Sequence, residues 1–144
     1  MQTRPLAEAP YPTLKGAEGE LLSIAITVEP RLLERLLDAL AGLDFPINPQ
    51  IYHQAAIVHK YADGRQQVQP VTMVEFPAYA SRLTEVRAAI EKLELPSDAL
   101  VHQPALECLH SGFIATPAPP GAAYAVVVRY RHWSPQAAQA ANRQ

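Results

Sequence analysis

Residues 22–40 read LSIAITVEPRLLERLLDAL and hold two periodicities side by side. In the first part, large apolar side chains alternate with smaller ones, which is the pattern of a β-strand with one strongly apolar face. The large apolar positions are Leu22, Ile24, Ile26 and Val28. Pro30 then fits the first turn of a helix, and leucines follow at helical spacing until Gly42. We therefore expect a strand followed directly by an amphipathic helix.

The segment after this helix resembles two strands around a tight turn. Residues 47–61 and 65–76 flank Asp63-Gly64, and Asp-Gly is the strongest short-range signal for a hairpin. If these two residues are the loop, opposite residues have numbers that sum to 127. Ile57 would then face Pro70, and His53 would face Val74. Both faces of the hairpin are partly apolar, so we expect something to cover the second face.

A second helix and two further strands are expected downstream. The helix is expected to open at Pro77, with one apolar stripe formed by Tyr79, Leu83, Val86, Ile90 and Leu93. Residues 99–106 predict a weaker strand that Pro104 ends or places at an edge. Residues 123–133 are rich in Val and Tyr and predict a fifth strand.

Length and composition limit the classes of protein to consider. The chain has 144 residues, 49% of them apolar, and a formal net charge of -2, which gives no general attraction to a nucleic acid. A single cysteine excludes an internal disulfide and favours the cytoplasm. We expect neither a signal peptide nor a membrane span, because residues 1–12 hold no apolar core and no run of eighteen apolar residues occurs. We expect an extended arm over 1–19, a folded domain over 20–106, a connection with a C-terminal strand over 107–133, and a flexible tail over 134–144.

The order of elements over residues 20–106 predicts an α+β fold. It is the ferredoxin-like βαββαβ order, with a four-stranded antiparallel sheet, two helices on one face and, here, an extra C-terminal strand. The stretch LSIAITVEP over 22–30, the following LLERLL over 32–37 and the Asp63-Gly64 hairpin are similar to the ACT-domain type of regulatory module within this superfold.

The resemblance to ACT modules implies a non-catalytic protein that senses a small molecule and pairs with a second copy. ACT modules that bind amino acids commonly place an acidic residue and a glycine between the first strand and the first helix; here Glu29 supplies the acid, and no glycine is present. The apolar second face of the predicted sheet independently favours a homodimer. The cleft that we expect to bind a ligand is formed by Glu29, Asn48, Gln50, Tyr52 and His53.

Two other functions remain open. A small dimeric α+β barrel enzyme has the same element order, and in it His53, Tyr52 and Met73 would point into an enclosed cavity that holds an organic substrate. An assembly or DNA-associated scaffold would use Arg129, Arg131 and Trp133, which share one side of the last predicted strand. More often, such arginines reach solvent or the carboxylates of a partner.

We expect no metal, no cofactor and no catalytic residue. Cys108, His110 and His102 are the one group of residues that could approach a shared metal. No CxxC, HExxH or closely spaced acidic ligand reinforces that group, and no GxSxG motif marks a nucleophile.

Overall fold

The structure is a computed structural model that describes residues 15–16, 18–108 and 112–134. The undescribed residues are 1–14 and 17 of the arm predicted over 1–19, 109–111 of the connection predicted within 107–133, and 135–144 of the tail predicted over 134–144. The strands are β1 (Lys15–Gly16), β2 (Gly19–Val28), β3 (Gln50–Lys60), β4 (Gln66–Tyr79), β5 (Leu100–Pro104), β6 (Phe113–Pro117) and β7 (Val126–Tyr130). The helices are α1 (Leu33–Ala41), α2 (Leu83–Ile90) and the short α3 (Ala105–Cys108), with 3-10 turns at Pro30–Leu32, Ala80–Arg82 and Glu91–Leu93.

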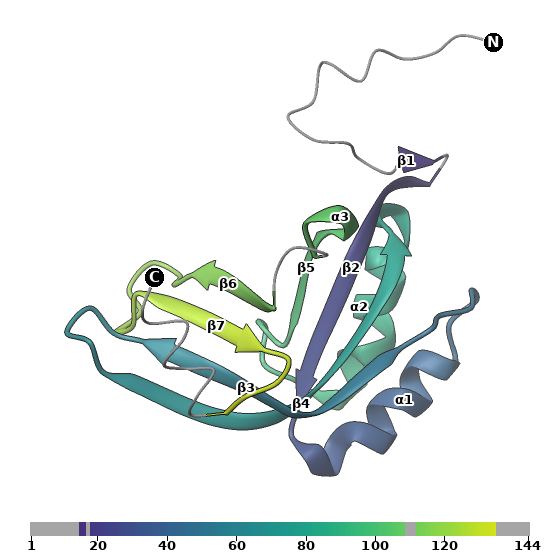
Figure 1. Cartoon of the computed structure of the whole chain (residues 1–144). Coiled ribbons are helices and arrows are strands. Elements are labelled where there is room, and N and C mark those ends of the chain that lie inside the picture. Colours follow the sequence, from purple (N-terminus) through teal and green to yellow (C-terminus); the bar gives the residue numbers. More distant parts are fainter. Residues whose placement is uncertain (1–14, 17, 109–111, 135–144) are drawn as a thin grey trace, which may run out of the picture.

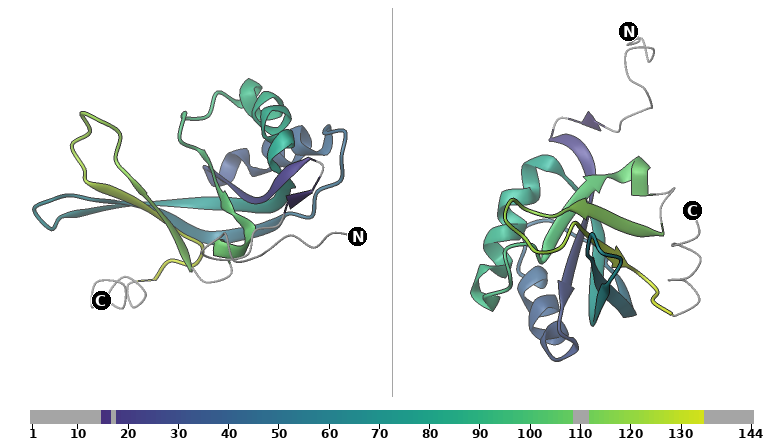
Figure 2. Two further views of the ribbon diagram at one scale, coloured as in Figure 1. Left: turned by 90° about the horizontal axis from the view of Figure 1, so that it is seen from above. Right: turned by 90° about the vertical axis from the view of Figure 1, so that its left-hand side faces the viewer.

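Six of these strands form one curled antiparallel sheet in the order β5-β2-β4-β3-β7-β6 (Figure 1). The two-residue strand β1 pairs with the start of β2. Helices α1 and α2 lie together on one face, and the β6–β7 hairpin curls away from them, so the sheet is a half-barrel (Figures 1 and 2). The prediction of a four-stranded ferredoxin-like sheet with two helices is therefore wrong.

The error arises from residues after Pro104. The segment expected to be a connection contains the helix α3 and the strand β6, so two strands, not one, extend the sheet beyond β3. The signal for β6 was the run Phe113-Ile-Ala-Thr between Gly112 and Pro117, because aromatic and β-branched residues favour strands. The nearby prolines and glycines are typical of a loop, so no strand is predicted there.

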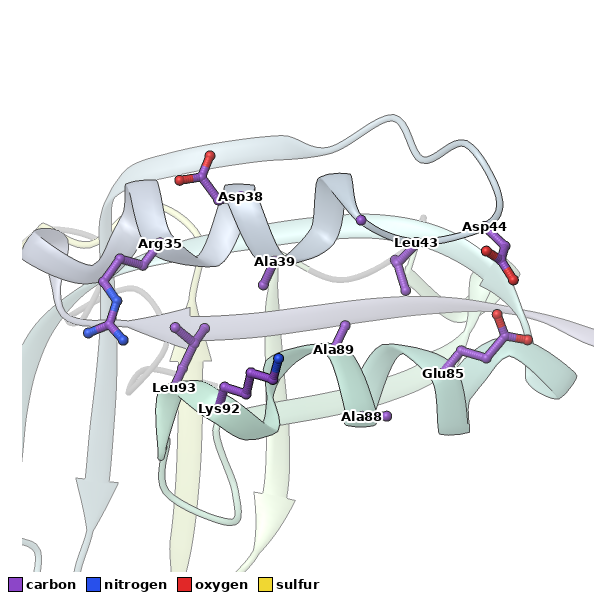
Figure 3. A pocket seen from close by; sticks show the side chains of 11 residues that line it. Arg35, Asp38, Ala39, Leu43, Asp44, Glu85, Ala88, Ala89, Lys92 and Leu93 are labelled. Carbon is purple, nitrogen blue, oxygen red and sulfur yellow. The ribbon is translucent and has the colours of Figure 1, made fainter.

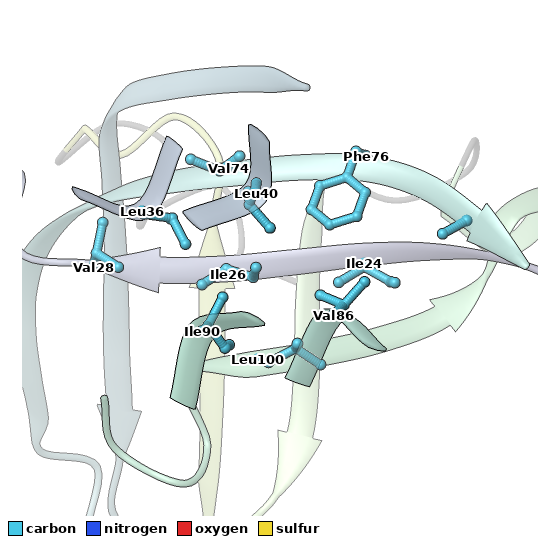
Figure 4. Close-up of a cluster of buried hydrophobic side chains, with 11 residues drawn as sticks. Ile24, Ile26, Val28, Leu36, Leu40, Val74, Phe76, Val86, Ile90 and Leu100 are labelled. Carbon is cyan, nitrogen blue, oxygen red and sulfur yellow. The ribbon is translucent and has the colours of Figure 1, made fainter. Parts of the chain in front are cut away.

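The helical face holds the larger hydrophobic core (Figure 4). Alternate residues of β2 and β4 meet the leucine stripe of α1 and the Val86–Ile90 side of α2. The buried members are Ile24, Ile26, Val28, Leu36, Leu40, Val74, Phe76, Ala78, Val86, Ile90 and Leu100. The apolar face of the strand and the apolar stripe of the helix in residues 22–40 thus pack against each other on one side of the sheet.

The opposite face of the sheet is concave and is covered by the chain itself. Ile114 of β6 packs with Ala25 of β2 and Met73 of β4, although three strands of the sheet lie between β2 and β6. Such a contact requires the sheet to curl toward this face. Apolar residues of this face, among them Val71 and Met73, are therefore buried within one chain and no longer serve as evidence for a second copy.

The register of the β3–β4 hairpin differs from the prediction. Ile57 faces Gln69, and Lys60 faces Gln66, so the numbers of opposite residues sum to 126 instead of 127. The amide of Tyr61 donates to the carbonyl of Arg65, and Gly64 has a φ of 93°, which makes a three-residue loop with glycine in the left-handed region. A shift by one residue moves side chains to the other face. A bulge between Tyr52 and Ala55 then changes the register again.

Pro77 lies inside β4 and does not open a helix. It faces Ser23 of β2, and α2 begins six residues later at Leu83. The pairing of β3 with β4 extends only as far as Glu75, so Pro77 has a partner strand on one side alone. Proline is tolerated at such a position because its missing N–H interrupts no second ladder.

None of the helices within the described ranges is both long and apolar enough to cross a lipid bilayer.

Candidate functional site

A cleft of about 530 Å³ opens at one end of the concave face, and we call it the concave-face cleft. Its first wall is made of inward-facing strand residues, its second of the segment that joins β2 to α1, and its third of the loop between α2 and β5. The lining residues are Thr27, Val28, Glu29, Arg31, Leu32, Arg35, Ile57, His59, Gln69, Val71, Leu93, Glu94, Leu95, Pro96, Asp98 and Ala99. The lining therefore mixes an apolar floor with side chains of both charges.

Arg129 lies directly beside this cleft. It is paired with Ile57 across β3 and β7, so both side chains lie on the concave face, and it contacts Asp98; both of these neighbours line the cleft. Its side chain is only 1% exposed. Nη2 donates to the backbone carbonyl of Asp98 at 2.9 Å, and Nη1 donates to Oγ1 of Thr116 at 3.2 Å. Nε has no hydrogen-bond partner.

The carboxylate nearest to Arg129 in a described ion pair belongs to Asp98, and the contact is loose. Oδ2 of Asp98 lies 3.6 Å from Nη2, and the Asp98 side chain is 57% exposed. Burial lowers the pKa of Arg129, and Asp98 opposes that effect without cancelling it. The guanidinium is thus removed from water without a hydrogen-bonded anion, which is a costly arrangement for a charged group.

A second buried arginine, one residue beyond the end of β7, has a complete set of partners. Nε and Nη2 of Arg131 donate to the two oxygens of Glu75 at 2.7 and 2.9 Å. Ser23 donates to Oε2 at 2.7 Å, and the thiol of Cys108 donates to the same oxygen at 3.2 Å. Arg131 also donates to Sγ of Cys108 at 3.0 Å. We call these four residues the Glu75 clasp; it joins β2, β4, α3 and the residue that follows β7.

The electrostatics of the Glu75 clasp favour its charged form. Burial by itself would raise the pKa of Glu75, but the hydrogen bonds from Arg131, Ser23 and Cys108 outweigh burial, so the pKa is lowered. The hydrogen bond from Arg131 to Glu75 raises the pKa of Arg131 despite desolvation. Tyr52 lies close to the clasp, and its pKa is raised by burial and then by the charge of Glu75.

The residues predicted to form one ligand cleft are divided between two places. Glu29 lines the concave-face cleft, where its carboxylate pairs with Nε of Arg31 at 2.7 Å. Asn48, Gln50, Tyr52 and His53 line none of the four described pockets.

The latter four residues lie at the start of β3 or just before it. Asn48, Gln50 and His53 are exposed, and Gln50 faces Glu75. Tyr52 is half-buried, faces Met73 and makes an edge-to-face ring contact with His132. His53 lies within the bulge of β3.

Two of the three metal ligands considered from the sequence lie within the described residues. His102 is exposed, Cys108 belongs to the Glu75 clasp, and His110 lies outside the described residues. Within the part of the chain that the structure describes, no group of three or more His, Cys, Asp or Glu residues could hold a metal ion.

The arginine strip of the last strand also differs from its prediction. Arg129 and Arg131 do share a face, but that face is buried, and their carboxylate partners come from the same chain. Trp133 packs with Tyr130 instead, at a ring distance of 5.0 Å, and so belongs to the outer face. Sequence reasoning missed Glu75 and Asp98 as partners because each is more than thirty residues away.

The largest of the four described pockets, about 710 Å³, is an open groove between α1 and α2 on the helical side of the molecule (Figure 3). Its middle is lined by Ala39, Ala88 and Ala89, and charged side chains lie along its edges. None of its described lining side chains has a buried polar atom that lacks a hydrogen-bond partner. The concave-face cleft is therefore the stronger candidate for a functional site.

No protein-family model matches this chain, and a search of curated proteins also found no match.

Proposed function

We propose that this protein is a non-catalytic module that binds a small organic molecule in the concave-face cleft. The observation that carries the proposal is the position of Arg129: a buried guanidinium with an unpartnered nitrogen lies beside a cleft of about 530 Å³. Buried polar atoms in folded proteins nearly always have partners, and exceptions gather at sites of function. Pockets for small ligands are typically about 300–1,000 Å³ and combine apolar walls with a few polar groups.

Binding without chemistry is the better-supported form of the proposal. The described thiol, Cys108, and the buried carboxylate of Glu75 hydrogen-bond to each other and to Arg131. Neither residue lines the concave-face cleft. His59 does line it, and its ring makes an edge-to-face contact with Tyr124. The enzyme alternative needs a cavity that contains His53, and this exposed residue lines none of the described pockets.

Amide chemical shifts of the ¹⁵N-labelled protein test the proposal directly. The probes are acetate, succinate, glutamate, glucose and adenosine, each added singly at millimolar concentration. We expect at least one of them to shift amides at the cleft and to be recovered unchanged after prolonged incubation. Gln69→Trp, which fills the cleft from an exposed position, should abolish the shifts. Gln67→Trp is the matched control, because Gln67 lies on the same face of β4 but does not line the cleft. If none of the probes shifts the cleft amides, or if Gln69→Trp binds as the unmodified chain does, the proposal is wrong.

The proposed binding site needs no second copy, because one chain supplies its whole described lining. Homodimer formation stays a prediction, supported now by the exposed apolar side chains of Ile51, Val68, Tyr79 and Phe113. A cytoplasmic location is also still a prediction, and it rests on the unpaired Cys108.

A further inference from the structure

We infer that the concave-face cleft takes an oxyanion of its ligand, a carboxylate or a phosphate, onto Arg129 in place of the side chain of Asp98. This inference rests on the proposed function, because it names the chemistry of a ligand in the same cleft.

The first step is the charge balance of Arg129. Its two described hydrogen bonds go to neutral oxygens, the Asp98 carbonyl and the Thr116 hydroxyl. The carboxylate of Asp98, at 3.6 Å from Nη2, is beyond a good hydrogen bond, and Nε is unpartnered. Oxyanions bind guanidinium groups best through two parallel N–H bonds, and Nε with an adjacent Nη offers one such pair. Arg131, whose Nε and Nη2 hold both oxygens of Glu75, shows the same geometry when it is complete.

The second step is access. Asp98 lines the cleft and contacts Arg129, whereas Arg129 itself is not part of the lining, so Asp98 links the guanidinium to the cleft. Asp98 is on the loop between α2 and β5, and its side chain is more than half exposed. A rotation of this side chain toward solvent breaks only the loose ion pair with Arg129, because no described hydrogen bond holds the carboxylate.

The third step is the charge of the rest of the cleft. Arg35 adds an exposed positive charge to the lining, and the carboxylate of Glu29 is already paired with Arg31. Glu94 is exposed. Asp98 is thus the carboxylate that competes directly with an incoming oxyanion for Arg129.

The competition gives a signed test. We expect Asp98→Asn to bind an oxyanion about 3- to 10-fold more tightly than the unmodified chain. The substitution keeps the shape of the side chain but removes a negative charge that repels the oxyanion by about 1 kcal/mol. The probes are inorganic phosphate and succinate, titrated at low ionic strength and followed by amide shifts of cleft residues. Arg129→Met should abolish binding of both. Asp63→Asn is the matched control, because Asp63 forms an exposed pair with Arg65 elsewhere.

The possible results separate the two levels of the proposal. Tighter binding of phosphate alone, of succinate alone or of both to Asp98→Asn supports the inference and identifies which oxyanion the cleft takes. Unchanged or weaker binding of both probes overturns it, and this variant keeps the test valid even if Arg129→Met fails to fold. If glucose or adenosine then still shifts the cleft amides, the proposed function stands and the oxyanion inference alone is wrong. If no probe of any charge shifts them, both are wrong.

Discussion

Arg129 and Arg131 are two residues apart, lie on the same concave face and are both buried, yet their surroundings differ. Arg131 is held by both oxygens of a buried carboxylate, and its pKa is raised. Arg129 meets two neutral oxygens and one loose, exposed carboxylate, and its pKa is lowered. Both residues are buried arginines, so neither burial nor residue type distinguishes them. Their hydrogen-bond partners do distinguish them, and for that reason we propose a structural role for Arg131 and a binding role for Arg129.

The largest expected effect comes from breaking the complete pair. Arg131→Met should lower the free energy of unfolding by about 3–5 kcal/mol, because it leaves the buried charge of Glu75 uncompensated. Chemical denaturation at neutral pH measures this loss. The double variant Glu75→Met with Arg131→Met should recover most of it, since replacing both partners by apolar groups is often nearly neutral. A double variant as unstable as the single one would contradict the view that the cost lies in the orphaned carboxylate.

A second, smaller effect is the loss of folding stability at acid pH. The pKa of Glu75 is lowered from its ordinary value of 4.5, so its carboxylate stabilises the fold above that pH, and this contribution is lost as the pH falls through the folded-state pKa. Glu75→Gln should therefore lose less stability than the unmodified chain between pH 7 and pH 3. Urea unfolding across this range measures the slope. Parallel pH profiles for the two proteins would show that Glu75 is not the residue responsible.

A third effect isolates the thiol of the Glu75 clasp. Cys108→Ala removes one of the hydrogen bonds to Glu75 but leaves those from Arg131 and Ser23, so we expect a loss of about 1 kcal/mol. Thermal unfolding with Cys108→Ser as the conservative control measures it, because serine can keep the bond to the carboxylate. A loss as large as that of Arg131→Met would mean that the thiol, and not the arginine, holds the clasp together.

The last effect is as small as that of Cys108→Ala and has the opposite sign. Arg129→Met should raise the free energy of unfolding by about 1 kcal/mol, because an apolar side chain replaces a buried charge that has no hydrogen-bonded anion. The same denaturation experiment detects it. A loss of stability above about 2 kcal/mol would show that Arg129 is a structural residue like Arg131 and would contradict the proposed difference between them.

The sequence pattern could predict elements better than their assembly. The alternation at residues 22–28 and the leucine spacing after Pro30 lead to β2 and α1, because both patterns are local. The curl of the sheet depends on contacts such as Ile114 with Ala25, which no local pattern encodes. Pro77 is a second example: its local pattern predicts the start of a helix, but the proline is tolerated in β4 because the pairing of β3 with β4 has already ended.

The candidate site was predictable only in part. Glu29 could be located at the cleft because it sits between a strand and a helix that were both recognisable. The shared face of Arg129 and Arg131 also followed from strand periodicity. Their different partners did not, because Glu75 is 56 residues from Arg131 and Asp98 is 31 residues from Arg129.

The side-chain Nε–H resonances of the two arginines test the central claim most directly. When inorganic phosphate and succinate are titrated in turn into the ¹⁵N-labelled protein, the Nε–H signal of Arg129 should shift and saturate with at least one of them, while that of Arg131 should stay in place as an internal control. If neither signal moves at millimolar concentrations of either anion, or if both signals move together, Arg129 does not bind an oxyanion, and the account is wrong.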